Sequence, residues 1–347
     1  MRLYSDAKIS GFLREVTIEQ SVAFLNEWND KRRNREKIYI SYDSTNKLCQ
    51  AGNISFIEKG HSKNGGTEPV FNYSVAYDRN NKEPLFYEEY SGSIVDMEQL
   101  QYMVEKAKAY GYKKIGFILD RGYFSQPNLT YIDECGYDFV IMVKGMKSLV
   151  RSKILENKGK FEEDRTCSIR EYETSGITKK RFLFPSDTKE RCVHLYYSIE
   201  KARKERADLE QKIDRIAKYL EKQEGKKVTI DKSFEKYFKL IYFHKGQKDE
   251  CFFKAKEKTE VINEEIRLCG YFAIITSEEM TAKEALILYK SRDVSEKLFR
   301  GDKSYLGNKS LRVQTDEAAK TKIFIEFVAL IVRNKIYMPA GGSKKQQ

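Results

Sequence analysis

Near the carboxyl end of the chain, side chains with useful chemistry stand at a fixed spacing: Tyr289, Arg292, Glu296 and Lys303. Their offsets of 0, 3, 7 and 14 residues would place them within an arc of about 60° on one helix face. That face would present a carboxylate beside a phenol and two cations. The alternative is the solvated face of an ordinary amphipathic helix, and Gly301 could end the helix before Lys303.

Two aspartates follow apolar strand patterns and would add further carboxylates. The alternating segment 37–43 ends in Asp43, and turn-forming residues follow it. The apolar segment 114–119 is followed by Asp120, and a helix pattern before it indicates a parallel strand beside the first. Ligand sites in open α/β sheets lie outside the carboxyl ends of such strands. Three carboxylates gathered there would suit Mg²⁺, a hard cation that prefers oxygen ligands.

Composition favours a polyanionic partner. The chain has 347 residues, with 64 Lys and Arg against 52 Asp and Glu, for a net charge of +12. This excess makes nucleic acid the default partner. The length fits two domains, or one domain with a large insertion. The longest apolar run, residues 323–332, is broken by Glu326 and is too short to span a bilayer, so no membrane association is expected.

Cysteine and histidine usage gives no sign of a zinc site or a disulfide framework. The six cysteines are dispersed without a CxxC pair, and the three histidines match no zinc spacing. Reduced, mostly buried thiols in a cytoplasm are therefore expected.

The elements that must position the acidic residues can be read from periodicity and turn residues. Asp96 is expected as the N-cap of its helix, with Gln99 completing a capping box. The Gly-rich loop 60–66 lacks phosphate-loop spacing and is assigned no nucleotide. The patterns predict helices at 17–33, 96–111 and 125–135, strands at 37–43, 114–119 and 138–144, and a hairpin of strands 71–77 and 84–90.

From about residue 145 the chain becomes strongly charged and reads as an insertion. A long helix is predicted at 200–223, and its narrow apolar stripe indicates an intramolecular packing seam, with a partner-binding helix as the alternative. The stripe consists of Leu209, Ile213, Ile216 and Leu220. Strands are predicted at 166–172, 181–184, 192–197, 237–243 and 270–276, followed by one helix from Ala282 through the Glu296 motif and a last helix at 316–338.

The assembled motifs resemble those of DDE transposases of bacterial insertion sequences. Tyr289, Arg292, Glu296 and Lys303 fit that group's pattern Tyr-x2-Arg-x3-Glu-x6-Lys without a gap. The resemblance covers roughly residues 37–335. Its other parts are Asp43-Ser44-Thr45, Gly60-His61-Ser62-Lys63, Asp120-Arg121-Gly122-Tyr123 and Gly270-Tyr271-Phe272.

The resemblance implies an α/β fold with an RNase H-like mixed sheet flanked by helices, and a large, mostly β insertion carrying one long helix. The expected division is a short helical remnant at 1–36, a catalytic core at 37–145 and 270–338, an insertion domain at 146–269, and a disordered tail at 339–347.

The resemblance also implies metal-dependent DNA strand cleavage and strand transfer. Asp43 would bridge two Mg²⁺ ions while Asp120 and Glu296 each hold one, and Mn²⁺ would substitute. Such a pair of ions activates the attacking oxygen and stabilises the leaving oxygen of a phosphodiester. Arg292 and Lys303 would hold DNA phosphates, and Tyr289 would hydrogen-bond to the DNA backbone.

The implied partners are the insertion-sequence ends and the target DNA. The resemblance further implies a homodimer when the protein is assembled on DNA, and a bacterial, cytoplasmic protein associated with the nucleoid.

Two features depart from the pattern and leave alternatives open. Some relatives hold a flipped base with an insertion-domain tryptophan during hairpin formation, but the one tryptophan here is Trp28. Tyr271 or Phe272 could stack a base instead, or both could be core residues of a strand. Relatives also usually carry a longer amino-terminal region. A truncated, DNA-binding copy that cannot transpose is therefore one alternative, and an RNase H-like host nuclease or resolvase is another.

Overall fold

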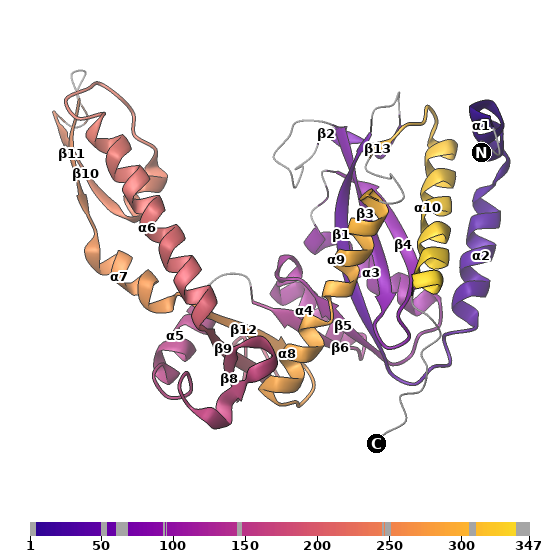
Figure 1. Cartoon of the computed structure of the whole chain (residues 1–347), viewed down its shortest axis with the longest axis horizontal. Helices are drawn as coiled ribbons and strands as arrows, with labels where there is room; N and C mark the ends of the chain where they lie inside the picture. Colours follow the sequence, from indigo (N-terminus) through magenta and orange to yellow (C-terminus); the bar gives the residue numbers. More distant parts are fainter. Residues whose placement is uncertain are drawn as a thin grey trace.

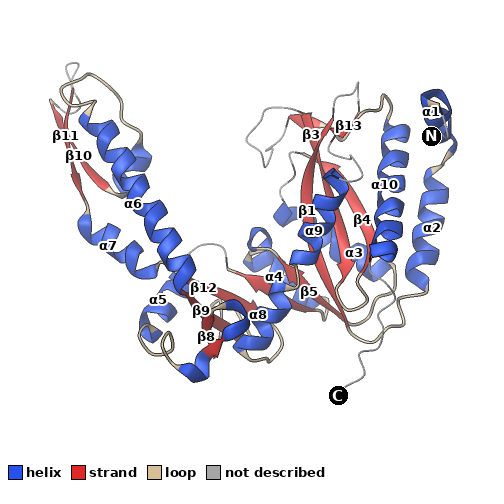
Figure 2. Ribbon diagram, in the orientation of Figure 1, coloured by secondary structure: helices blue, strands red, loops and turns tan. Residues whose placement is uncertain are grey.

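The computed structural model describes residues 5–49, 54–59, 69–92, 94, 96–143, 148–244, 246, 251–304 and 310–337. Within these ranges a mixed sheet of 11 strands is flanked by helices, and an arm projects from one end of it (Figures 1 and 2). The expected mixed α/β architecture with a long helix is thereby confirmed. The predicted loop 60–66 and tail 339–347 lie outside the described residues.

The half of the sheet that carries both aspartates combines parallel and antiparallel pairs. Strand β1 is parallel to β5, and β5 is parallel to β6, whereas β3 is antiparallel to both β1 and β4. The predicted hairpin and the predicted parallel neighbours are therefore correct. The bounds are β1 (Ile38–Cys49), β3 (Pro69–Asp78), β4 (Glu83–Ser91), β5 (Ile115–Leu119) and β6 (Asp138–Met142), with β2 (Glu58–Lys59) beside β3 and β13 (Ser310–Leu311) beside β1.

The other half of the sheet is built largely from the insertion. Strand β12 (Tyr271–Thr276) pairs with β6 on one side and with β9 (Arg191–Ser198) on the other, and β8 (Thr174–Arg181) and β7 (Ser168–Ile169) follow. The predicted strands 166–172 and 181–184 are wrong in extent. Strand β8 consists largely of Thr, Lys and Arg, so it lacks an apolar pattern, yet it pairs with β9 along its whole length.

Helices cover both faces of the sheet (Figure 2). On one face, α3 (Asp96–Ala109) and α4 (Gln126–Glu134) bury Leu100, Met103, Leu129 and Ile132. The opposite face is covered by α8 (Ala282–Lys290), α9 (Asp293–Ser304) and α10 (Asp316–Tyr337), with α1 (Asp6–Glu15) and α2 (Ile18–Asp30) outside α10. No helix in the described ranges is long and apolar enough to cross a membrane.

Side-chain caps define the starts of helices α2 and α4. Thr17 and Gln20 form a capping box at α2, and Ser125 caps α4. Helix α3 begins at Asp96, whose side chain lies outside the described set, while Gln99 Nε2 donates to Glu88 Oε2 over 2.6 Å. The six cysteines are free thiols, but the expectation that most are buried is wrong, because only Cys49 and Cys192 are.

Strand β1 continues well past Asp43, which corrects the prediction that the strand ends there. Ser44, Thr45 and Asn46 are expected to form a turn, but residues 44–48 pair with β3. Asn46 Nδ2 donates to Asn72 Oδ1 on the neighbouring strand over 2.6 Å. These cross-strand contacts satisfy polar groups that would otherwise favour a turn.

The arm has a hydrophobic core of its own. Helix α6 packs Ile213, Ile216 and Leu220 against the arm's own hairpin, formed by strands β10 and β11, and against helix α7. The predicted packing seam is therefore confirmed. Helices α5 and α7 and strand β11 were not predicted. The bounds are α5 (Ser148–Asn157), α6 (Ile199–Glu221), β10 (Phe238–Phe243), β11 (Cys251–Glu257) and α7 (Thr259–Leu268).

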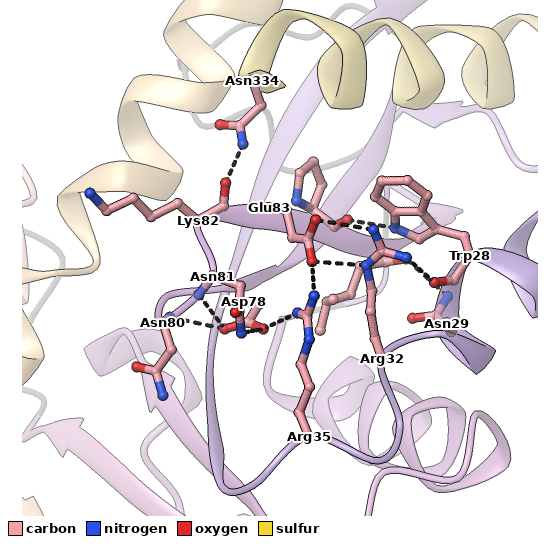
Figure 3. A network of polar contacts seen from close by, with 12 residues as sticks. Trp28, Asn29, Arg32, Arg35, Asp78, Asn80, Asn81, Lys82, Glu83 and Asn334 are labelled. Carbon is pink, nitrogen blue, oxygen red and sulfur yellow. Dashed lines mark hydrogen bonds and ion pairs between the residues drawn. The ribbon is translucent and has the colours of Figure 1, made fainter. Parts of the chain in front are cut away.

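A buried ionic network joins α2 to the β3–β4 hairpin (Figure 3). Arg32 Nε donates to Glu83 Oε1 over 2.8 Å, Arg35 also donates to Glu83, and Lys335 Nζ lies 3.0 Å from Glu83 Oε2. Burial alone would raise the pKa of Glu83, but the hydrogen bonds from these three cations outweigh it and lower the pKa to about 2.

We expect Glu83→Gln to destabilise the protein by about 3 kcal/mol at pH 7, because it leaves the buried Arg32 guanidinium uncompensated. Since the folded pKa of about 2 lies below the ordinary value of 4.5, this contribution is complete above pH 4.5 and is lost as the pH falls through 2. Denaturant titrations of the wild type and the variant across this pH range should show that the difference between their free energies of unfolding becomes smaller as the pH falls. The exposed Glu36→Gln is the control, and a difference independent of pH would contradict the assignment.

Candidate active site

Asp43 lies on β1, and Asp120 directly follows the neighbouring strand β5. The register pairs Tyr42 of β1 with Leu119 of β5, so the two aspartates are the next residues at the same level. Adjacent strands are about 4.8 Å apart, which brings the two carboxylates close together. Because side chains alternate along a strand, both aspartates face the side covered by α8 and α9, opposite Tyr42 and Leu119.

Glu296 reaches this place on α9, but the single helix predicted through the motif is wrong. Helix α8 ends at Lys290 and α9 begins at Asp293, so Tyr289 lies on α8 and Arg292 in the junction. Ser291 caps α8, where its Oγ donates to the Leu288 carbonyl over 2.5 Å.

The break has a packing cause. The apolar residues of α8, including Leu286 and Leu288, pack against β5, β6 and β12. Those of α9, Leu298 and Phe299, pack instead with β3 and α10. A single helix could not bury both apolar sets against different regions of a twisted sheet. The chain therefore bends between them, and the bend turns Arg292 toward the aspartates.

Arg292 lies among the three predicted acids. Its Nη2 is 2.8 Å from Glu296 Oε1 and 3.7 Å from Asp120 Oδ1, and its Nη1 is 3.8 Å from Asp43 Oδ2. The side chain is 14% exposed, against 16%, 36% and 49% for Asp43, Asp120 and Glu296. The structure thus brings the three acids together around one guanidinium.

Tyr289 completes the cluster from the α8 side. Its hydroxyl donates to Asp120 Oδ1 over 3.4 Å, and the Arg292 guanidinium carbon lies 5.7 Å from its ring centre. Burial raises the pKa of Tyr289 well above its ordinary range, and the Asp120 charge adds to this. The phenol therefore stays protonated and acts as a hydrogen-bond donor.

Lys303 lies half-buried in the last turn of α9, because Gly301 does not end the helix. At seven residues beyond Glu296 it shares that face, about 10 Å further along the axis. A methyl group at Gly301 would displace the Arg333 guanidinium of α10.

Polar residues that no sequence motif marks hold α9 on β1. Ser295 Oγ donates to Ser41 Oγ over 2.7 Å, and Lys47 pairs with Asp302 deep in the interior. Neither Lys47 nor Asp302 is part of a motif in the sequence. Their positions are the feature of the sequence that could have identified them. Lys47 lies four residues after Asp43, and Asp302 lies directly before Lys303.

The donor set suits a hard divalent cation, since carboxylate oxygens are the ligands that Mg²⁺ and Mn²⁺ prefer. In this conformation the carboxylates surround Arg292 instead of converging on one point. Accordingly, no group of three His, Cys, Asp or Glu side chains in the described part of the chain is arranged to hold a metal ion. The guanidinium neutralises charge that a metal ion would otherwise neutralise.

A hollow of about 480 Å³ lies between the sheet and the base of the arm. Arg121, the residue after Asp120, lines it together with Lys201 of α6 and Lys236 of the arm. Glu205 and Glu265 also line it, so its charge is mixed.

Comparison with protein-family models finds one described as "Transposase DDE domain", which matches residues 36–332. The comparison with curated proteins finds no match.

Solved structures give weak similarities. The piggyBac transposase synaptic complex with hairpin DNA has a TM-score of 0.42 and 10% identity, over 86% of this chain and 48% of that one. The pre-cleavage Mos1 transpososome has a TM-score of 0.20 and 8% identity, over 39% of this chain and 43% of that one. Ciona intestinalis endonuclease V in complex with an inosine-containing DNA has a TM-score of 0.20 and 13% identity, over 54% of this chain and 81% of that one. The chain thus spans about half the length of the first two proteins.

We expect Arg292→Gln to lower the stability of the metal-free protein by about 2 kcal/mol, because the three acids lose their counter-ion and its charged hydrogen bond. Added Mn²⁺ should then stabilise the variant more than the wild type. Thermal unfolding with EDTA and with Mn²⁺ measures both effects. The exposed neighbour Lys297→Gln is the control. Equal Mn²⁺ stabilisation of Arg292→Gln and wild type would show that guanidinium and metal do not share these acids.

Proposed function

Because the chain belongs to the family of transposase DDE domains, we propose that it is a transposase that cleaves and joins DNA with divalent metal ions. The observation that carries this proposal is the gathering of Asp43, Asp120 and Glu296 around a single cation, Arg292. These acids come from two strands and a helix far apart in the sequence. An ordinary surface ion pair would not require such convergence.

The three acids would hold two Mg²⁺ ions, with Asp43 shared between them and Asp120 and Glu296 on one each. When bound, the ions would activate the attacking oxygen and stabilise the leaving oxygen of a phosphodiester. The residues of the chain provide the orientation. Asp43 and Asp120 are held by paired strands, and Tyr289 donates to Asp120 and thereby restricts its carboxylate.

Arg292 would change partners during the reaction. Its guanidinium and the metal ions compete for the same carboxylates, so metal loading would free it to bind a DNA phosphate through its planar fork. Lys303 would contact the same strand as a point charge, and Tyr289 would contact the DNA backbone. This arrangement fits the bacterial insertion-sequence group defined by Tyr-x2-Arg-x3-Glu-x6-Lys.

The DNA would run from the acidic cluster toward the base of the arm. Arg121, which follows Asp120, lines the hollow at the base of the arm together with Lys201 and Lys236, and the chain carries a net charge of +12. The proposed substrates are the insertion-sequence ends and the target DNA, bound by a homodimer at the bacterial nucleoid. We assign catalysis to residues 37–145 and 270–338, and DNA contacts to the insertion at 146–269.

We expect each of three single variants, Asp43→Asn, Asp120→Asn and Glu296→Gln, to reduce Mg²⁺-dependent strand cleavage by roughly a thousandfold or more. The reason is that the three carboxylates would act together, so the loss of any one would disable the site. Cleavage of a labelled duplex by the purified variants measures this loss. Thermal midpoints and DNA affinity should stay near the wild-type values, because none of the three belongs to the apolar core. Glu279→Gln, an exposed acid paired with Lys180, is the control. A variant that keeps substantial cleavage would remove its residue from the site.

Arg292→Ala and Lys303→Ala should weaken DNA binding about equally for all sequences and each lower the salt slope by about one unit. The reason is that each cation releases counterions from a phosphate it contacts. Binding isotherms at several salt concentrations, in the presence of a divalent ion, measure the slopes. Lys297→Ala, on the same helix, should leave the slope nearly unchanged. An unaltered slope for Arg292→Ala would show that its guanidinium stays with the carboxylates.

A further inference from the structure

We infer that Lys47 is a positioning residue that holds helix α9, and with it Glu296, against the strand that carries Asp43. The inference rests on the proposed function, since it gives Lys47 a part in assembling that site. Lys47 Nζ lies 2.7 Å from Asp302 Oδ2 on α9 and 2.7 Å from Glu326 Oε2 on α10. The side chains of Lys47, Asp302 and Glu326 are 1%, 0% and 6% exposed.

Lys47 comes from the same face of β1 as Asp43. Side chains alternate along a strand, so Ser41, Asp43 and Lys47 all project toward α9. Ser41 accepts from Ser295, at the start of α9, and Lys47 binds Asp302, near its end. Two polar anchors on β1 therefore flank the aspartate.

The partner residues also share one face of α9. Ser295 and Asp302 are seven residues apart, which returns the helix to within about 20° of the same direction. Glu296 lies about 100° around the axis from this line, toward Arg292. Fixing the line of anchors fixes both the rotation of the helix and the direction of Glu296.

Apolar packing alone would define that rotation less sharply. Leu298 and Phe299 bury α9 in the core, but hydrophobic burial is non-directional. An ion pair over 2.7 Å between two buried charges fixes the separation of its partners, and in the interior the alternative is two unpaired charges. The Lys47–Asp302 contact therefore supplies the specificity that the apolar face lacks.

The triad provides a matched pair of variants. Asp302→Asn weakens the tie between Lys47 and α9, whereas Glu326→Gln weakens the tie to α10 and leaves the tie to α9 intact. Both substitutions are nearly isosteric, and both remove one carboxylate charge from the same buried cluster. A role limited to overall stability would make the two variants alike.

The first readout is hydrogen exchange without metal. Asp302→Asn should speed exchange of the α9 amides at 293–304 by about tenfold relative to those of α10, and Glu326→Gln should not. The second readout is a Mn²⁺ titration followed by the thermal midpoint. Here Asp302→Asn should raise the half-saturating Mn²⁺ concentration about tenfold, as expected when ligand orientation is loosened, and Glu326→Gln less than about twofold.

Lys47→Met should combine both effects, and the two isosteric variants carry the test if that protein does not fold. Equal behaviour of Asp302→Asn and Glu326→Gln in both readouts would overturn the inference. If the wild type itself shows no Mn²⁺ response while Asp302→Asn still loosens α9 selectively, the proposed metal-dependent function fails and the anchoring role stands. If the wild type responds to Mn²⁺ without any selective effect of Asp302→Asn, the inference alone fails.

Discussion

Repulsion among three neighbouring carboxylates is the constraint on which the arrangement of this protein depends. Asp43, Asp120 and Glu296 would move apart if they were attached to flexible segments, because like charges at short range disfavour one another. The fold answers by placing two on paired strands and the third on a helix tied to one of those strands. Arg292 then offsets the remaining charge. The rigid backbone and the Arg292 cation together stabilise the cluster of three acids against their mutual repulsion.

The bend between α8 and α9 lets one short segment serve two packing surfaces. Helix α8 belongs to the half of the sheet that includes the insertion strands, and α9 belongs to the half that includes the β3–β4 hairpin. Arg292 occupies the corner between them. A shift of one half of the sheet relative to the other would therefore first displace Arg292, the residue that contacts all three acids.

Sequence patterns predicted much of this structure because the core strands and helices carry strong periodicity and clear caps. The segment 114–119, the hairpin and Ser125 are examples. Strand β8 was misplaced because its pairing with β9 outweighs a weak local preference. The extension of β1 past Asp43 and the bend near Arg292 were missed for the same reason, since both are set by neighbours distant in the chain. Lys47 and Asp302 could not be paired from sequence alone, because 254 residues lie between them.

The pairing of β6 with β12 also sets when the site can form during synthesis. Strand β6 ends at Met142 and β12 begins at Tyr271, so β6 exposes an unpaired edge while the ribosome makes the residues between. At roughly 5–20 residues per second this interval lasts about 6 to 26 seconds. Glu296 and Asp302 emerge later still. A nascent chain therefore carries two aspartates without their third partner until almost all of its sheet is in place.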